Sequence, residues 1–338
     1  MSTLLEHPEH PDGRAETDAH ETGSRVRRWR RQTIRFMPIV VFVVLLLAIS
    51  SQVPGMLTTR SLLTMADSAA PLVALSIGAT LVILCGAIDL STAALASLSS
   101  VLLALWIPSM GAWAAIVVIL VAGAAGALQG VVYVVFKVPS FVVTLGGMAL
   151  WSGLALVFSN AGSLPVSDLD ALSWGSGKMG GLVPHSVVVT GLVVALVIVA
   201  MLLTPFGRSV RAIGYGESAA RLAGLPVGAV KIAALTLSGM TSGLAGALLV
   251  AQTFSGSSTL AGGLLLPSLA AIVIGGTAIT GGFGGLMRTV VGVLIIVLLR
   301  SGLGLIGLDP GVEPVLYGVL IIGAISLTID RSRLAVLK

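Results

Sequence analysis

The sequence predicts an all-α integral membrane protein with about ten transmembrane helices and both termini in the cytoplasm. Of its 338 residues, 56% are hydrophobic and 10% are charged, and the mean hydropathy is +1.06. Because soluble domains carry about 25% charged residues, this chain has too few charges to cover a surface in water. Two further observations support the prediction: a series of long apolar runs, and the way basic residues are sorted between the segments that join them.

Ten apolar runs follow the first 36 residues, and most approach the length of about 20 residues that a membrane-spanning helix needs. They are centred in Pro38–Val53, Met65–Cys85, Leu90–Ile107, Ala112–Phe136, Phe141–Phe158, Pro184–Leu203, Ile232–Gln252, Ser268–Ile279, Thr289–Leu305 and Val315–Ile329. Ten crossings place both ends of the chain on the same side of the membrane.

The basic residues agree with this count when the N-terminus is placed in the cytoplasm. The inner segments then contain Arg25, Arg27, Arg28, Arg30, Arg31, Arg35, Lys137, Arg208, Arg211, Arg221, Lys231, Arg288, Arg331, Arg333 and Lys338. The outer segments contain Arg60 and Lys178, with Arg300 near the outer end of its helix, and they also hold Asp168, Asp170, Asp309 and Glu313. An excess of Lys and Arg on the inner side is typical of membrane proteins.

The chain divides into one membrane domain and two tails. Residues 1–36 are polar, lack apolar periodicity and are expected to form a disordered cytoplasmic tail that ends in the Arg cluster. Residues 37–330 are expected to form the ten-helix domain, and residues 331–338 a short cytoplasmic tail. The Arg cluster could belong to a nucleic-acid-binding arm, but directly before an apolar run it is typical of an orientation signal, so no nucleic-acid partner is expected.

The sequence contains no motif for catalysis or nucleotide hydrolysis. The Gly-Lys pair Gly177-Lys178 is followed by Met179, so the phosphate-binding pattern G-x-x-x-x-G-K-[ST] is missing. His185 stands apart from other possible metal ligands. We therefore expect a protein that is not an enzyme and binds no metal or cofactor of its own. If transport uses ATP, another chain must hydrolyse it.

The segment Gly86–Ser91 joins two apolar runs without a basic residue, which predicts a break in the helices at membrane depth. Asp89 and Ser91 would then lie at the start of the next helix, where Asp can cap free N–H groups. Because non-helical backbone inside a membrane occurs only beside protein or a water-filled cavity, Gly86, Asp89 and Ser91 are candidates for a translocation pathway. The alternative is that Asp89 is only a structural cap.

A second break is predicted at Gly275-Gly276-Thr277, which a further glycine-rich stretch follows at Gly281–Gly285. Paired breaks in the two halves of a transporter indicate a central pathway, so Gly275, Gly276 and Thr277 are also candidates. The alternative is close packing of helices through small residues.

The connection Thr204–Val230 is the longest predicted inner segment and contains a short amphipathic helix, Glu217–Ala223. Gly224 fits the residue after a helix end, and Pro226 prevents extension. Such a helix could enter a groove of a partner protein, or it could lie on lipid headgroups. The candidate docking residues are Gly214, Gly216, Glu217, Ala219, Ala220, Arg221, Leu222, Ala223 and Gly224.

Four stretches resemble the permease subunits of bacterial ABC importers for ribose and other monosaccharides, including the related autoinducer permeases. They are LVILCGAIDLS (Leu81–Ser91), VPSFVVTLGGM (Val138–Met148), the segment Thr204–Gln252, and LAAIVIGGTAITGGFGG (Leu269–Gly285). They are spread over nearly all of the predicted membrane domain. The chain departs from the family at Thr92-Ala93, where Val-Gly is common, and at Gly86-Ala87, where Gly-Gly is frequent.

The resemblance implies a multi-pass permease of the bacterial inner membrane that translocates a monosaccharide or similar small polar solute. It implies three kinds of partner: two cytoplasmic ATPase subunits, an extracytoplasmic binding protein that delivers and selects the solute, and a second permease copy, identical or paired. It also implies that Gly214–Gly224 docks the ATPase. Two alternatives remain. One is a permease for branched-chain amino acids or an autoinducer, and the other is an ion-coupled carrier that uses Asp67 or Asp89.

Overall fold

The structure is a computed structural model that describes residues 37–53, 55–305, 309 and 311–328. Seven helices in this part of the chain are long and apolar enough to cross a membrane. They are α2 (Thr59–Leu84), α3 (Thr92–Met110), α4 (Trp113–Val135), α5 (Ser140–Phe158), α7 (His185–Leu203), α10 (Val227–Thr253) and α12 (Leu286–Leu305). The remaining three apolar runs form the shorter helices Met37–Ser50, α11 (Leu265–Ile274) and α13 (Val312–Thr328). A helical multi-pass protein is thereby confirmed, while ten crossings stay a prediction.

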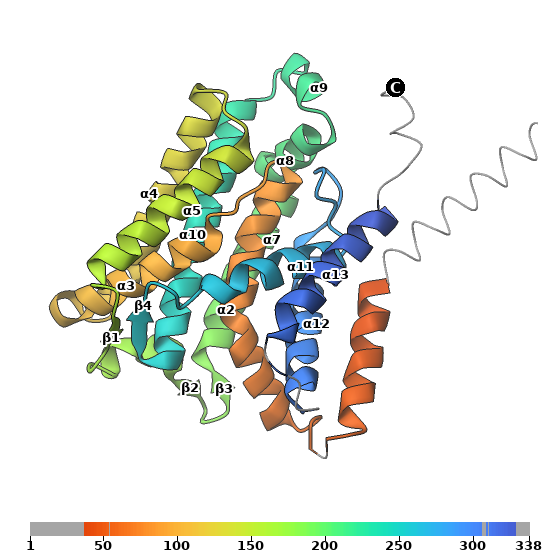
Figure 1. Cartoon of the computed structure of the whole chain (residues 1–338). Coiled ribbons are helices and arrows are strands. Elements are labelled where there is room, and N and C mark those ends of the chain that lie inside the picture. The colour runs from red at the N-terminus through yellow and green to blue at the C-terminus, as the bar shows by residue number, and fades with distance from the viewer. Residues whose placement is uncertain (1–36, 54, 306–308, 310, 329–338) are drawn as a thin grey trace, which may run out of the picture.

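Helices α2 and α10 lie side by side in the middle of the bundle (Figure 1). One side of this pair packs against α3 and α4, and the other packs against α7, α11 and α12. The side chains of α2 are buried without interruption from Ala69 to Leu84. Gly126 and Gly239 let α4 and α10 approach closely, because a Cβ at either glycine would lie 2.2 Å from a backbone oxygen of the other helix. These two are packing glycines, as expected for small residues between membrane helices.

The outer faces of the bundle are apolar. Large side chains such as Val135, Val157, Leu192 and Leu203 are more than half exposed along α4, α5 and α7. Hiding apolar surface from water contributes about 25 cal/mol per Å², so such a surface would be unfavourable in water and is stable against lipid or another apolar helix.

The two ends of the bundle differ. At one end β1 (Ser163–Pro165) pairs antiparallel with β4 (Ser255–Ser257), and β2 (Lys178–Met179) pairs with β3 (Val183–Pro184), close to the short helices η1 (Asp170–Leu172) and α6 (Ser173–Ser176). A further short helix, η2 (Gly262–Leu264), precedes α11. At the opposite end lie α8 (Pro205–Tyr215) and α9 (Glu217–Leu222), as Figure 1 shows.

Helix α8 corrects the expectation of a single short helix between Thr204 and Val230. Pro205 occupies its first turn, Val210 and Ile213 are buried, and Arg208 is exposed. Glycine disfavours a helix interior, so Gly207 and Gly214 gave this segment a low helix propensity and no helix was predicted there. Both glycines are needed for close packing: a Cβ at Gly207 would lie 1.9 Å from the carbonyl oxygen of Met201.

Candidate functional site

The first predicted break is present between α2 and α3. Helix α2 ends where the N–H groups of Gly86 and Ala87 bond the carbonyls of Ile83 and Val82, at 2.8 and 3.1 Å. This helix stop needs a left-handed residue after the last turn, and Gly86 supplies it with φ of +75°. Helix α3 begins at Thr92, so Asp89 and Ser91 lie at the start of this helix, as the sequence predicts, although the Ser91 side chain makes no capping hydrogen bond.

Asp89 anchors the break to α10. Its Oδ1 accepts the backbone N–H of Ser91 at 2.9 Å and the hydroxyl of Ser91 at 2.6 Å, and its Oδ2 accepts the hydroxyl of Ser238 at 2.8 Å. Asp89 is 5% exposed, so both carboxylate oxygens bond donors of this chain in a buried place. Asp89 therefore joins the residue before α3 to α10, and its place beside a translocation pathway stays a prediction.

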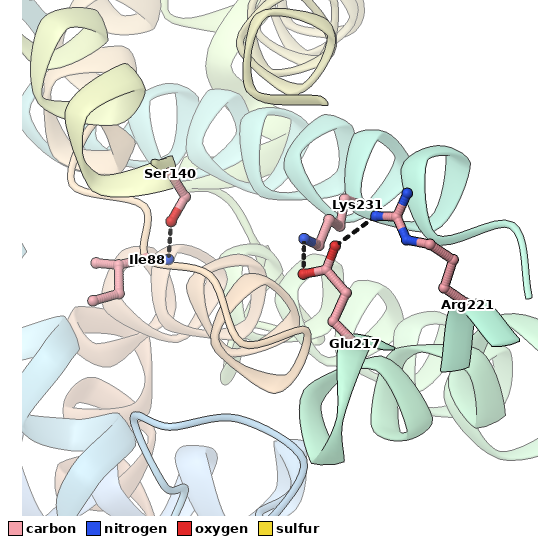
Figure 2. Close-up of polar contacts among 5 residues, drawn as sticks. All are labelled: Ile88, Ser140, Glu217, Arg221 and Lys231. Atoms are coloured by element: carbon pink, nitrogen blue, oxygen red, sulfur yellow. Dashed lines mark hydrogen bonds and ion pairs between the residues drawn. The ribbon is translucent and has the colours of Figure 1, made fainter. Parts of the chain in front are cut away.

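The break is also bonded to α5. The N–H of Ile88 donates to Ser140 Oγ at 3.1 Å (Figure 2), and Thr144 Oγ1 donates to the carbonyl of Ile88 at 3.1 Å. Both backbone groups of Ile88 therefore have partners, which a non-helical segment inside the bundle requires.

The second predicted break lies between α11 and α12 and has the same helix stop. The N–H groups of Gly276 and Thr277 bond the carbonyls of Val273 and Ile272 at 2.8 and 3.1 Å, and Gly276 has φ of +79°. Gly275 instead packs against α12, because a Cβ there would lie 2.5 Å from the carbonyl oxygen of Arg288. Gly275 therefore allows close packing against α12 and Gly276 ends α11, while their place beside a translocation pathway stays a prediction.

The two breaks meet at the end of α8, at a point that we call the glycine junction: Gly86, Gly214, Gly281 and Gly282. The N–H of Gly282 donates to the carbonyl of Leu84 at 3.1 Å. A Cβ at Gly214 would lie 2.0 Å from that same oxygen, and one at Gly281 would lie 2.7 Å from Gly86 Cα. The junction joins α2, α8 and the loop before α12. The sequence showed Gly281 and Gly282 as a glycine-rich stretch, but it gave no sign that they meet Gly214.

Helix α9 has the predicted start and stop. It begins at Glu217 and ends at Leu222, one residue earlier than expected. The N–H groups of Gly224 and Leu225 bond the carbonyls of Arg221 and Ala220, at 3.0 and 3.1 Å, and Gly224 has φ of +76°. Gly216 is its extended N-cap, so Gly214 and Gly216 flank the turn between α8 and α9.

The candidate docking residues of α9 do not all face outward. Leu222 is 90% exposed, and Ala219, Arg221, Ala223 and Gly224 are exposed beside it. Ala220 is 5% exposed and belongs to the apolar core. This burial corrects the prediction that Ala220 is a docking residue, because a buried Ala220 cannot present its side chain to a partner.

Glu217 turns toward the bundle and bonds two cations (Figure 2). Its Oε2 lies 2.6 Å from Lys231 Nζ, and its Oε1 lies 2.9 Å from Arg221 Nη2. The side chain of Lys231 is 8% exposed, whereas that of Arg221 is 70% exposed. Lys231 Nζ also lies 4.7 Å from the ring centroid of Tyr133 in α4. The hydrogen bond from Lys231 is the main cause that holds the pKa of Glu217 below its ordinary value of 4.5.

The carboxylates of the ion-coupled alternative lie far apart. Asp67 accepts a hydrogen bond from the Ser186 hydroxyl of α7, and its backbone carbonyl accepts the Gln252 amide at 2.7 Å. About 25 Å of helix separates Asp67 from the end of α2, where the break that holds Asp89 begins. Within the described residues, no group of three or more His, Cys, Asp or Glu side chains could hold a metal ion.

Comparison with known proteins gives a consistent result over most of the chain. Residues 61–325 match the family described as the branched-chain amino acid transport system permease component. The probable ABC transporter permease protein YphD of Escherichia coli K12 is 37% identical over 85% of this chain and 87% of its own length.

Two further relatives are import permeases by name. The ribose import permease protein RbsC of Bacillus subtilis 168 is 34% identical over 88% of this chain and 93% of its own length. The L-arabinose ABC transporter permease protein AraH of Azospirillum brasilense is 31% identical over 86% of this chain and 84% of its own length. No solved structure matches the chain. With its membrane-spanning helices, the chain is therefore a multi-pass inner-membrane protein that belongs to this family of ABC transporter permeases.

Proposed function

We propose that this chain is the transmembrane subunit of an ABC importer for a monosaccharide or a similar small polar solute. The observation that supports this most strongly is similarity to ribose and arabinose permeases over more than four fifths of the chain. The matched region includes both breaks and α9. The family description mentions branched-chain amino acids, but the relatives compared above that carry a substrate in their names are sugar permeases.

The test is uptake by cells that express this chain together with its own ATPase and binding protein. We expect saturable uptake of a labelled pentose such as ribose or arabinose, and no uptake of labelled leucine. Cells that lack only this chain are the control. Uptake of leucine without any sugar would contradict the proposal.

The proposed assembly contains two cytoplasmic ATPase subunits, an extracytoplasmic binding protein and a second copy of the permease. ATP is hydrolysed by the ATPase subunits, because this sequence has no phosphate-binding loop. In this arrangement the chain makes ten crossings with both termini in the cytoplasm. The end with α8 and α9 faces the ATPase, and the end with β1 to β4 faces the binding protein. The chain itself is not an enzyme, and its own partners include no nucleic acid.

The proposed translocation pathway runs beside the two breaks. Gly86, Asp89, Ser91, Gly275, Gly276 and Thr277 border it in this proposal. Their support is the interrupted helices and the tight hydrogen bonding of the breaks, which fixes irregular backbone inside the bundle. In this role Asp89 and Ser91 shape the wall of the pathway.

The proposed ATPase-docking surface is the exposed face of α9, centred on Leu222. Fully burying a leucine side chain contributes about 1.5–3 kcal/mol, so this one residue offers a partner substantial binding energy. We expect Leu222→Asp to abolish co-purification of the ATPase and solute uptake, while the amount of permease in the membrane stays near normal. Co-purification from detergent, with uptake in parallel, is the measurement.

Leu182→Asp is a matched control, because Leu182 is also exposed but lies at the opposite end of α7. This variant should retain the ATPase. If Leu222→Asp retains the ATPase and full uptake as well, α9 is only an interfacial helix and the docking surface lies elsewhere.

A further inference from the structure

The position of α9 depends on its contacts with the bundle. A six-residue helix is too short to be stable alone in water. On its inner side Ala220 packs in the apolar core with Val227 and Val230, and Glu217 pairs with Lys231. These contacts on the inner side of α9 therefore fix the position of its exposed face around Leu222.

Of the two cations bonded to Glu217, Lys231 contributes more to holding α9 in position. Exposed ion pairs such as Glu217–Arg221 contribute little, because water solvates both partners when they separate. The ammonium of Lys231 is buried, and its described partners are the Glu217 carboxylate and the ring of Tyr133. The Glu217 side chain is 43% exposed, so only the Lys231 end of the pair is buried. Moving α9 away from α10 would leave the buried ammonium without its carboxylate, which opposes this movement.

Helix α10 bears a second polar contact on the same face. Lys231 and Ser238 are seven residues apart, which is about two turns of helix, so their side chains point in similar directions. Ser238 donates its hydrogen bond to Asp89 in the break between α2 and α3. The first half of α10 thus contacts α9 through Lys231 and the break between α2 and α3 through Ser238.

We propose that the Glu217–Lys231 ion pair and the Ser238–Asp89 hydrogen bond form a strap along α10 that transmits displacement of α9 to the break between α2 and α3. The inference rests on the proposed docking of an ATPase on α9. Glu217, Lys231 and Ser238 are positioning residues in it, and they contact neither the solute nor the ATPase. Asp89 is the receiving end of the strap rather than an ion-binding group.

The test uses the permease assembled with its ATPase and binding protein. The variant Glu217→Gln/Lys231→Met removes both charges together, so that no buried charge is left unpaired. Ser238→Ala removes the hydrogen bond to Asp89 at the other end of the strap. We expect each variant to lower the rate of uptake about tenfold, a usual size for coupling between linked sites. Membrane abundance, ATPase co-purification and basal ATP hydrolysis should remain unchanged.

Two further variants separate a strap from a general loss of stability. If the two contacts act in series, losing either one already interrupts the strap. Combining Glu217→Gln/Lys231→Met with Ser238→Ala should then lower uptake no further than either change alone. Independent effects would instead multiply to about a hundredfold loss. Lys231→Arg keeps the charge and should restore most of the uptake.

Matched controls remove similar contacts elsewhere. Glu313→Gln removes the ion pair with Arg300, and Ser242→Ala removes a hydrogen bond within α10 to the Ser238 carbonyl. Both should transport normally.

Three results would overturn the strap: normal uptake by Glu217→Gln/Lys231→Met, a multiplicative loss in the combined variant, or loss of ATPase co-purification by Glu217→Gln/Lys231→Met. The last would place Glu217 in the docking contact itself. Failure of the unmodified chain to bind the ATPase would refute the proposed function instead, so the two failures are distinguishable.

Discussion

At the scale of single residues, three glycines end helices in the same way. Gly86, Gly224 and Gly276 each follow a last helical turn with φ between +75° and +79°, and the same pair of hydrogen bonds closes each stop. An L-residue in this conformation crowds its Cβ against the backbone, which is why glycine marks these ends in the sequence. Helix stops are local events, so all three were predictable without knowledge of the fold.

Gly214 differs, because its neighbours rather than its own conformation require glycine. We predict that Gly214→Ala destabilises the permease by about 1–3 kcal/mol, the usual cost of overpacking, since the added Cβ would collide with the Leu84 carbonyl and the Gly282 amide. Thermal unfolding of the purified protein in detergent measures the loss.

The control for this variant is Gly191→Ala in the preceding helix. Gly191 has no atom within 4 Å of an added Cβ, so the substitution should be neutral or stabilise by about 0.5–1 kcal/mol through helix propensity. If both variants unfold at the same temperature as the unmodified protein, the glycine junction is not tightly packed.

At the scale of elements, the sequence pattern of α9 predicts some features of this helix and leaves others undetermined. Its start, its stop and its exposed Leu222 follow from the sequence. The direction in which Ala220 points does not, because a helix of six residues with small apolar side chains on several sides has no clear inner face. Packing on α10 buries Ala220 and leaves Ala219 and Ala223 exposed.

Between neutral pH and about pH 4.5, the position of α9 should not change with pH. The pKa of Glu217 is depressed, so its ion pair stabilises the seated helix above the ordinary value of 4.5 and is lost as the pH falls through the lower folded value. A fluorophore on Ser218→Cys, with Cys85→Ala to remove the native thiol, should give a constant signal from about pH 7.5 to about pH 5.5 and change below about pH 4.5.

In Glu217→Gln the same fluorophore should show no acid transition, since the titrating group is gone. A transition near neutral pH in the parent protein would mean that another group controls the position of α9.

At the scale of the whole molecule, the open question is the number of crossings. The helix Met37–Ser50 is shorter than the usual span, and α11 is shorter still. We predict that Ser24→Cys and Ser332→Cys, which lie outside the described residues, react with an impermeant thiol reagent only when the cytoplasmic face is accessible. Right-side-out and inverted vesicles of a Cys85→Ala background make the comparison.

Ser176→Cys and Ser218→Cys calibrate this experiment, because α7 is the one described membrane helix between them and places them on opposite sides. Ser176→Cys should react from outside and Ser218→Cys from inside. Reaction of Ser24→Cys from outside would show that Met37–Ser50 does not cross the membrane, and the ten-crossing topology would then be wrong.

The sequence by itself determined the membrane class of the protein, the positions of its apolar helices and the residues at which several of them stop. These properties depend on composition and on neighbours within one or two turns, where hydropathy and the steric freedom of glycine act directly. Only the tertiary structure decided that Gly86 meets Gly214 and Gly281, that Asp89 bonds Ser238, and that the buried Lys231 pairs with Glu217. These partners come from segments far apart in the chain, 149 residues for Ser238 and Asp89, and no local rule relates them. Which helices lie side by side is set by the packing of the whole bundle, and that packing gives each of these side chains its partner.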